Sequence, residues 1–444
     1  MGRSRVGSTN DQYAGVPPSV PKPAAEGHQA RREQLQRATV HATMRGAMVR
    51  SLLELRNLGP IESADVTFGD LTVFTGPQAS GKSIALQIIK LALDQAAIVR
   101  RMSDQGLAWR DGRAFVELYL GSGMRSLWSS ATTARWERRS LKPPNAPPSR
   151  ASDVDERVSY IPAQRVMSLR DGWTRPFDAY QAGDPYALRE FSQHLHDIVQ
   201  GELSSSDVLF PRAQRFHQAL RNVVDRHVLG GWELHVDADT LQKRFVIRPP
   251  QASAQGGEAG GSESSLPFLT WSAGQREFIP LLLGLYRLMP AGAVGRRGAL
   301  QWVIIEEPEM GLHPRAIAAT MAFVVELLRR EYRVVLSTHS TQVLDVVWGL
   351  RTLRELGGTP RDVAELLDIA ETTSVRNAAQ RALAADYRAY YVERGAPVRD
   401  VSALDPMSDD PTTAGWGGLT TFSERVANVV ARVVARSHSV ERTA

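Results

Sequence analysis

The stretch Leu71-Thr72-Val73-Phe74-Thr75-Gly76-Pro77-Gln78-Ala79-Ser80-Gly81-Lys82-Ser83-Ile84 decides the fold. Its first five residues have the composition of a buried strand, and residues 82–100 carry apolar side chains at helical spacing. Between them stands the pattern Gly-x-x-x-x-Gly-Lys-Ser, which forms a phosphate-binding loop when a strand precedes it and a helix follows it. The sequence therefore predicts an α/β fold of the P-loop NTPase type.

The residue types of this loop suit polyphosphate chemistry. Glycines let the main chain curl so that successive N–H groups point at phosphate oxygens, and the following helix adds its positive end. Lys82 is predicted to pair with the β- and γ-phosphates, and Ser83 to coordinate magnesium. The strand and helix disfavour the alternative, a plain glycine-rich turn. We expect ATP with Mg²⁺, bound by Gly76, Pro77, Gln78, Ala79, Ser80, Gly81, Lys82, Ser83 and Ile84.

A second motif places two carboxylates after an apolar run. Residues 302–305 read as a fully buried parallel strand, and Glu306 and Glu307 follow at its carboxyl end, where open α/β sheets bind ligands. We predict that Glu306 belongs to the magnesium shell and that Glu307 orients or deprotonates water. A solvated acidic turn is the alternative, and the P-loop elsewhere in the chain disfavours it.

Two further motifs are weak individually. Ser272, Gly274 and Gln275 open a predicted helix toward residue 289, which makes an anion site but also satisfies an ordinary Ser-x-x-Gln capping box. His339 follows a predicted strand at 334–338 and is positioned to bond a γ-phosphate or water, although a histidine at a strand end is more often structural.

The order of the four motifs resembles the ABC-type ATPases: Walker A, signature, Walker B and switch histidine. The resemblance is to the soluble branch with RecF-like, structural-maintenance-of-chromosomes (SMC) and OLD-family proteins, and above all to stand-alone AAA-family ATPases grouped with abortive-infection proteins. It covers roughly residues 51–435. The segments that carry it are LRNLGPI at 55–61, YIPAQR at 160–165, EEPEMGLHP at 306–314 and WGGL at 416–419.

The resemblance implies a composite site. The P-loop of one copy would hold ATP while Ser272, Gly274 and Gln275 of a second copy cap it, so ATP would drive formation of a homodimer. Lys82, Glu307 and His339 become the catalytic residues, and Gln164 becomes a Q-loop ligand of the magnesium. DNA or a separately encoded effector protein remain possible partners, in DNA repair or phage defence. The alternative is an ATP-dependent clamp with little turnover.

The sequence departs from the family pattern in places. Glu306 stands where Walker B usually ends in Asp, and His313 stands where transporter-type ATPases have Asp. The signature wording, Trp-Ser-Ala-Gly-Gln, argues against a transport ATPase. The acids that follow His339 do not form a convincing nuclease metal set.

The composition sets further limits. The chain has no cysteine, which excludes disulfides and thiolate metal sites. Its longest apolar stretches fall short of the roughly 18 residues of a membrane span, and no signal-peptide core opens the sequence, so we expect a cytoplasmic protein with no membrane partner. The net charge of +5 is compatible with contact to phosphate or nucleic acid, but an ordinary arginine-rich surface is the favoured interpretation.

The expected organisation has five parts. They are a disordered extension (1–48), the N-terminal half of the ATPase domain (49–170), an inserted helical arm (171–230), the C-terminal half (231–350) and a tail (351–444). Residues 114–120 and 127–138 alternate like the strands of an antiparallel β subdomain, and a hairpin is expected at 231–248. A linker rich in Gly and Ser follows at 252–265.

The predicted arm carries the basic residues that we expect to contact DNA or a partner. A solvated helical arm is the alternative. These residues are Arg189, His194, His196, Arg212, Arg215, Arg221 and Arg226.

Overall fold

The computed structural model describes most of the chain beyond residue 50. It covers residues 51–147, 154–204, 207–212, 214–237, 242–250, 265–292 and 295–403, with scattered positions from 405 to 432. The predicted extension at 1–48 and nearly all of the predicted linker at 252–265 lie outside the described residues.

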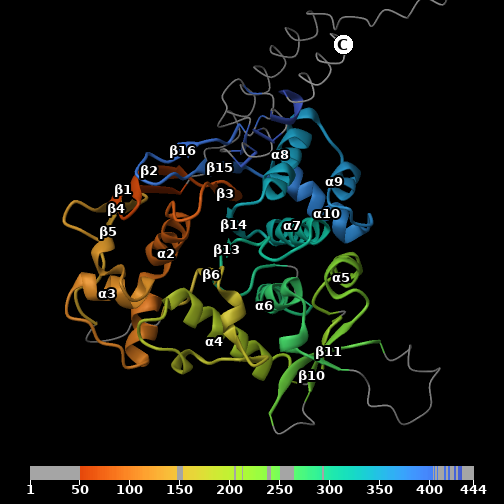
Figure 1. Ribbon diagram of the computed structural model, residues 1–444, viewed down its shortest axis with the longest axis horizontal. Helices are drawn as coiled ribbons and strands as arrows, with labels where there is room; N and C mark the ends of the chain where they lie inside the picture. Colours follow the sequence, from red (N-terminus) through yellow and green to blue (C-terminus); the bar gives the residue numbers. More distant parts are fainter. Residues whose placement is uncertain are drawn as a thin grey trace, which may run out of the picture. The chain divides into compact units, whose positions relative to one another are not determined.

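A six-stranded sheet forms the centre, in the order β16-β15-β3-β14-β13-β6 (Figure 1). Its parallel strands are β6 (Val158–Ile161), β13 (Trp302–Glu306), β14 (Arg333–Thr338), β3 (Leu71–Thr75) and β15 (Tyr387–Tyr391), and β16 (Arg399–Asp400) is antiparallel. In register, Thr75 faces Thr338, and Ser337 faces Glu306. The predicted parallel α/β layer is confirmed, and the P-loop, Walker B and switch motifs meet at one sheet edge.

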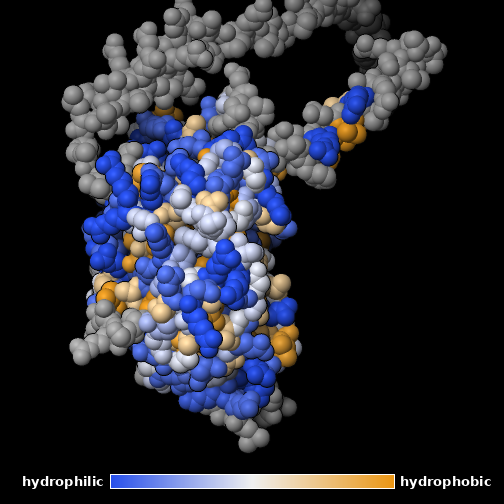
Figure 2. Space-filling model, turned by 90° about the vertical axis from the view of Figure 1, so that its left-hand side faces the viewer, coloured by the Kyte–Doolittle hydropathy of each residue, from blue (hydrophilic) through white to orange (hydrophobic). Residues whose placement is uncertain are grey.

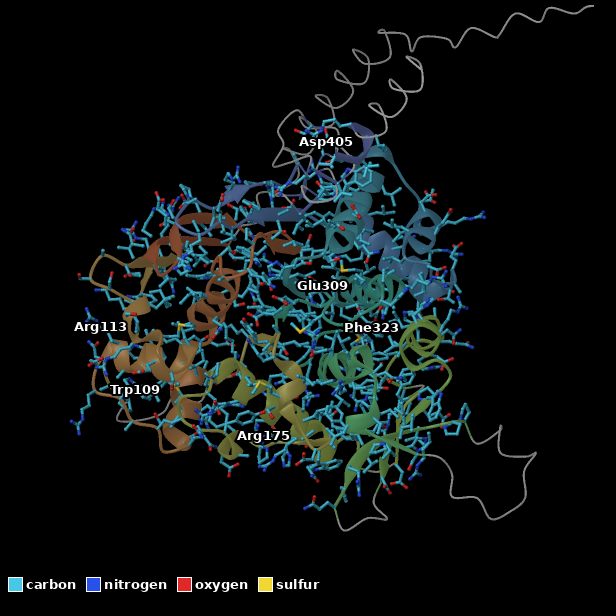
Figure 3. The ribbon with its side chains drawn as sticks, viewed as in Figure 1. Trp109, Arg113, Arg175, Glu309, Phe323 and Asp405 are labelled. Carbon is cyan, nitrogen blue, oxygen red and sulfur yellow. The ribbon has the colours of Figure 1, made fainter. Side chains whose placement is uncertain are left out.

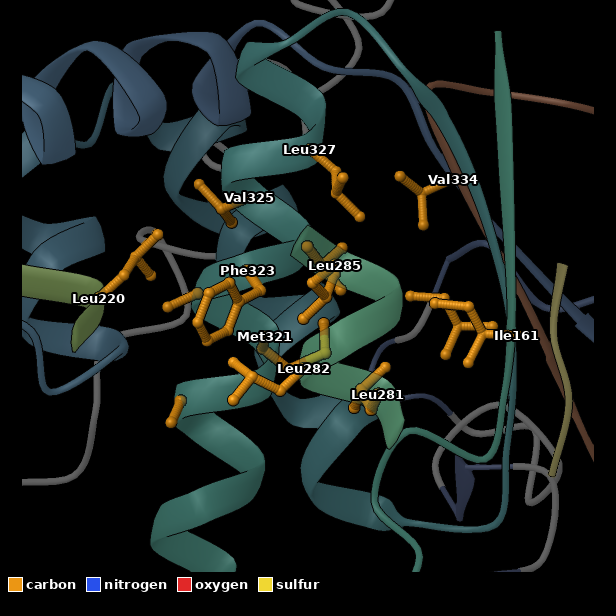
Figure 4. Close-up of a cluster of buried hydrophobic side chains, with 14 of the residues drawn as sticks. Ile161, Leu220, Leu281, Leu282, Leu285, Met321, Phe323, Val325, Leu327 and Val334 are labelled. Atoms are coloured by element: carbon orange, nitrogen blue, oxygen red, sulfur yellow. The ribbon is translucent and has the colours of Figure 1, made fainter. Parts of the chain in front are cut away.

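Apolar residues cover both faces of the sheet. Helix α2 (Lys82–Asp104) and an antiparallel sheet pack on one face, and α4 (Tyr186–Gln200), α6 (Ala273–Leu288), α7 (Pro314–Arg329) and α8 (Thr341–Leu356) belong to the other. Strand β3 serves both layers, because Val73 joins one core cluster and Phe74 the other. Figure 4 shows part of the second layer, with Leu282 and Leu285 near Phe323.

The antiparallel β subdomain is confirmed, with one correction. It consists of β2 (Ile61–Thr67), β1 (Leu52–Leu58), β4 (Thr133–Trp136) and β5 (Arg139–Leu141), in that order. The strand predicted at 114–120 is wrong, because these residues form helix α3 (Gly112–Leu120). Asp111 caps this helix by accepting a hydrogen bond from the Ala114 N–H, and Phe115, Val116, Tyr119 and Leu120 are buried at helical spacing.

Part of the predicted arm is buried in the core, whereas Arg226 is exposed. Helix α4 packs against α6, and Arg189, His194 and Arg215 are all buried. Arg215 donates to the Tyr286 carbonyl oxygen and to Glu202, so its guanidinium group makes its contacts inside the protein. For these three residues, burial contradicts both the predicted contact with DNA or a partner and the alternative of a solvated arm.

The last part of the predicted arm forms a sheet with the segment that follows it. Strand β9 (Val208–Phe210) precedes α5 (Gln218–Val224) and the π-helical turn η4 (Asp225–Leu229). It belongs to a second antiparallel sheet with β10 (Glu233–Asp237), β11 (Arg244–Arg248) and β12 (Leu266–Pro267). The pairing of β10 with β11 confirms the predicted hairpin.

The predicted tail completes the core. Strand β15 lies beside β3, and α9 (Pro360–Leu366) and α10 (Thr373–Leu383) pack with α7 and α8. Among the described residues, no helix is both long and apolar enough to cross a membrane. Short elements complete the fold: η1 (Met124–Leu127), η2 (Arg165–Ser168), β7 (Leu169–Arg170), β8 (Trp173–Thr174), η3 (Phe177–Ala179) and η6 (Phe268–Thr270).

Candidate ATP-binding site

The loop between β3 and α2 has the backbone that phosphate binding requires. Gly76 and Gly81 have φ values of 136° and 107°, and a Cβ at Gly76 would lie 2.1 Å from the Val392 carbonyl oxygen, so only glycine fits there. Within the described part of the chain, the N–H groups of residues 78–81 donate no hydrogen bond to the protein. They are therefore available to an anion at the start of a long helix.

Two buried hydroxyl groups also lie unpartnered in this region. Neither the Thr75 Oγ1 nor the Ser80 Oγ has a hydrogen-bond partner among the described residues. Buried polar atoms are normally paired, so these hydroxyls and the free N–H groups fit a polyphosphate ligand.

Lys82 is held inside the loop. Its Nζ donates to the carbonyl oxygens of Gly76 and Pro77, each at 2.8 Å. Burial lowers the pKa of Lys82 to about 8, although the attraction of Glu307 opposes this shift. A polyphosphate would offer the ammonium group a stronger partner than the two carbonyl oxygens.

ATP affinity should therefore depend on pH above neutrality. Below the pKa of about 8, Lys82 is charged in the free protein and affinity should be flat. Above that pKa the free protein loses the proton that the complex retains, so affinity should fall by up to about tenfold per pH unit. Titrating ATP binding by calorimetry across this range measures the effect. Lys82→Met should bind weakly and lose this pH dependence, and a flat wild-type profile contradicts the assignment.

The carboxylate of Glu306 is buried beside Ser83. One oxygen accepts from the Tyr160 hydroxyl at 2.7 Å, the other accepts from the Ala163 N–H at 2.8 Å, and the Ser83 hydroxyl also bonds this side chain. Burial raises the pKa of Glu306. A hydroxyl and a carboxylate in contact are the oxygen donors that magnesium prefers, so Ser83 and Glu306 fit the predicted metal site.

Within the described residues, no hydrogen bond joins the Gln164 side chain to Ser83 or Glu306. The Gln164 side chain is exposed and donates or accepts no hydrogen bond within the described residues. The main chain beside it does reach the site, because the neighbouring Ala163 N–H binds Glu306. The Q-loop role of Gln164 remains a prediction.

Glu307 and His339 come together as the motif order predicts. The Glu307 Oε1 lies 3.4 Å from the His339 Nε2, and the hydrogen bond from His339 lowers the pKa of Glu307. The Glu307 backbone has a φ of 42° and donates its N–H to the Ser337 carbonyl oxygen at 2.9 Å. An ionised, partly exposed carboxylate in this position can orient a water molecule and accept its proton.

Glu309 is a site residue that the motif reading missed (Figure 3). Its Oε1 accepts from the Thr338 hydroxyl and from the His339 N–H, both at 2.7 Å, and its Oε2 is buried without a partner among the described residues. It therefore fixes the main chain that carries the switch histidine. The third acid of Glu306-Glu307-Pro308-Glu309 was the available signal.

Arg165 is the second missed residue, and it is fully buried. Its guanidinium donates to the carbonyl oxygens of Glu306 at 3.0 Å, Glu307 at 3.1 Å and Glu277 at 3.0 Å. It thus ties the end of β13 to the first turns of α6, the helix that Ser272 opens. An arginine after Gln164 was visible in the sequence, but nothing local indicated these partners.

Arg165→Met should lower kcat by about 10²-fold while ATP affinity changes little, because small misplacements of a reacting group are costly. Stopped-flow nucleotide binding and steady-state hydrolysis separate the two quantities. Arg215→Met is the matched control, because Arg215 is also buried and donates to the Tyr286 carbonyl oxygen. That variant should lose stability but keep its kcat, and equal kcat losses in both variants exclude a positioning role for Arg165.

The signature residues do not reach the P-loop of their own chain. Ser272 caps α6 in a complete capping box with Gln275, so the ordinary alternative is present in the structure. Gly274 packs on the Walker B loop, because a Cβ there would lie 2.9 Å from the Gly311 carbonyl oxygen. Within the described part of the chain, no hydrogen bond or ion pair joins these three residues to residues 76–83.

Residues 186–345, less than half of the chain, match the family model described as "AAA domain, putative AbiEii toxin, Type IV TA system". No curated protein matches the chain.

Three solved structures are similar at low identity. The SMC head domain from Thermotoga maritima is 14% identical with a TM-score of 0.28, over 79% of this chain and 99% of that one. An SmcHead bound to the C-winged helix domain of ScpA is 10% identical with a TM-score of 0.33, over 79% and 97%. A bacterial Atm1-family ABC exporter with ATP bound is 10% identical with a TM-score of 0.30 over 67% of this chain, which spans only 36% of the exporter.

The part of the chain at 186–345 is thus similar to an AAA domain, and the P-loop motif stands at the edge of a parallel sheet.

Proposed function

We propose that this protein binds ATP with Mg²⁺ and hydrolyses the nucleotide at an interface between two copies of the chain. The observation that carries the proposal is the convergence of Lys82, Ser83, Glu306, Glu307 and His339 around the carboxyl ends of β3, β13 and β14. Each of these side chains has the chemistry that one step in the transfer of a phosphoryl group to water requires.

The roles follow from the contacts. Lys82 leaves its loop carbonyls and pairs with the phosphates, while the free N–H groups of the loop bind their oxygens. Magnesium, when bound by Ser83 and Glu306, would neutralise the developing charge. Glu307 orients water and accepts its proton, and His339 and Glu309 hold Glu307 and the switch main chain in place.

The second copy of the chain would contribute Ser272 and Gly274 to the site. They lie at the N-terminus of α6, where main-chain N–H groups attract anions, and Ser272 is exposed. The resulting ATP-dependent dimer would control engagement with DNA or with a separately encoded effector. The name of the matched family, a putative toxin of a type IV toxin–antitoxin system, makes phage defence one setting to test, and DNA repair is another.

A mixing experiment tests the composite site. Lys82→Ala lacks a working P-loop and Ser272→Ala lacks a signature hydroxyl, so each homodimer should hydrolyse ATP poorly. A mixed dimer has one intact site, and equal mixing should therefore restore roughly a quarter of wild-type activity. No recovery contradicts the composite site. Thr372→Ala controls for lost helix capping, because Thr372 caps α10 through the Val375 N–H and should keep full activity.

A further inference from the structure

A groove of mixed polar and apolar lining lies on the side of the molecule formed by α3 and the β4–β5 hairpin. Its volume is about 680 Å³, and its lining comes from residues 111–113, 128–130, 132–135, 140–143 and 145. Figure 1 shows α3, β4 and β5 together on one side, and Figure 2 shows that this face is largely hydrophilic. The proposed ATP chemistry uses none of these residues.

Three exposed cations line this groove. Within the described part of the chain, Arg113 and Lys142 form no ion pair. Arg135 is 3.7 Å from Glu54, but its side chain is 61% exposed and solvent weakens that pair. These charges contrast with Arg189 and Arg215, which the fold buries.

The acid in the groove already has partners. Asp111 accepts a hydrogen bond from the Ala114 N–H and pairs with Arg125 at 3.1 Å, outside the groove lining. Asp111 therefore neutralises little of the charge of Arg113 and Lys142. The groove presents a net positive lining to an incoming anion.

An aromatic ring and several neutral hydrogen-bonding groups complete the lining. Trp128 is half-buried and belongs to the lining of the groove. The neutral groups belong to Ser129, Ser130, Thr133, Ser140 and Asn145. Cations for phosphates, an aromatic surface for bases and small polar groups for sugars are the components of single-strand nucleic-acid sites. A groove of this volume accepts individual nucleotides rather than a duplex.

Packing connects the groove to the P-loop. Leu127, the neighbour of Trp128, packs so closely on Gly59 that a Cβ there would lie 2.3 Å from the leucine Cδ1. On the far side of this turn, a Cβ at Gly81 would lie 2.9 Å from both Pro60 and Ile61. The turn at residues 59–61 is thus wedged between the groove wall and the phosphate loop.

We propose that this groove binds single-stranded nucleic acid, with phosphates on Arg113 and Lys142 and a base stacked on Trp128. Occupancy changes the affinity of the P-loop for ATP through the turn at 59–61, and by linkage ATP changes the affinity for the strand equally. The binding itself stands independently of hydrolysis, whereas the coupling rests on the proposed function.

The test is the fluorescence anisotropy of a labelled oligothymidylate with the full chain at several salt concentrations. The double variant Arg113→Glu/Lys142→Glu should bind at least about tenfold more weakly, and its salt slope should be shallower by about 1.4, the value for two lost phosphate contacts. Trp128→Ala should weaken binding by about tenfold and leave the salt slope unchanged. The control Arg361→Glu/Arg376→Glu reverses two exposed arginines on α9 and α10 and should bind like wild type.

Every other outcome overturns the proposal. The wild-type chain could fail to bind the oligonucleotide at low salt, or the two double variants could lose affinity equally. Duplex DNA could compete for binding better than single strands. Polyglutamate could displace the oligonucleotide equally well from the wild type and from Trp128→Ala. The last outcome would indicate an acidic protein partner instead. ATP hydrolysis without oligonucleotide should be unchanged in all these variants. If neither the wild type nor any variant hydrolyses ATP but the oligonucleotide still binds, the proposed function is wrong and the proposed binding site in the groove is still supported.

Discussion

Replacing Glu307 with Gln should reduce ATP turnover by about 10²–10⁴-fold while nucleotide binding persists. Glutamine keeps the size of the side chain but cannot accept a proton from water. The hydrogen bond from His339 lowers the pKa of Glu307, so the native side chain is ionised and ready for that role. Because binding continues while hydrolysis stops, ATP should hold the variant as a dimer on size exclusion.

Glu309→Gln is the matched control for this experiment. Its remaining carbonyl oxygen can still accept the bonds from Thr338 and from the His339 N–H. We therefore expect a loss of less than about tenfold, because the geometry survives and no proton transfer is assigned to Glu309. Equal losses of turnover in both variants would contradict the assignment of Glu307 as the group that accepts the proton.

The same variant separates an ATPase from a clamp. If the protein works by turnover, Glu307→Gln should trap the ATP-bound dimer and stop release of DNA or effector. If ATP serves mainly as a clamp, partner binding should be unchanged in the variant. Turnover of Glu307→Gln within a few-fold of wild type contradicts the assignment of the catalytic base.

Replacing Lys90 with Met should lower the free energy of unfolding by about 3–5 kcal/mol. Lys90 is fully buried in α2, and its Nζ lies 2.9 Å from Asp94 and 3.0 Å from Glu190. Burial alone would lower the pKa of Lys90, but the attraction of Glu190 and Asp94 outweighs it and raises that pKa. Removing the ammonium group leaves two buried carboxylates without their cation.

This network also shapes the path from the P-loop helix to the site. Asp94 departs from helical geometry, with φ of −123°, and accepts from the N–H groups of Arg157 and Val158. Lys90 donates to the Val158 carbonyl oxygen. Strand β6 begins there and leads to Ala163 and Arg165, so loss of Lys90 should also disturb the Walker B contacts.

Guanidinium denaturation measures the effect of Lys90→Met. Arg100→Met is the control in the same helix, where the Arg100–Asp104 pair at 3.6 Å is solvent-exposed. Exposed pairs of this kind contribute less than about 1 kcal/mol. Equal losses in the two variants would show that the buried network adds nothing beyond a surface pair.

The chain's local sequence determined the elements whose signals are short-range. The P-loop, the capping box of α6, the β10–β11 hairpin and the parallel strands at 302–306 and 333–338 all follow from spacing, caps and apolar runs within a few residues. At 114–120, alternating apolar and polar residues wrongly predicted a strand. The segment forms a helix, because Asp111 caps its N-terminus and its apolar side chains are buried at helical spacing.

Only the tertiary structure decided how distant segments meet. Arg165 bonds residues 112 to 142 positions away, and Glu309 bonds His339, 30 residues later. Strand β15 pairs with β3, where Tyr387 lies opposite Leu71, 316 residues before it. The tertiary structure also buried Arg189 and Arg215 and left Arg113 and Lys142 exposed. Burial and long-range pairing depend on which surfaces the whole chain brings together, and a charged residue carries no local mark of that outcome.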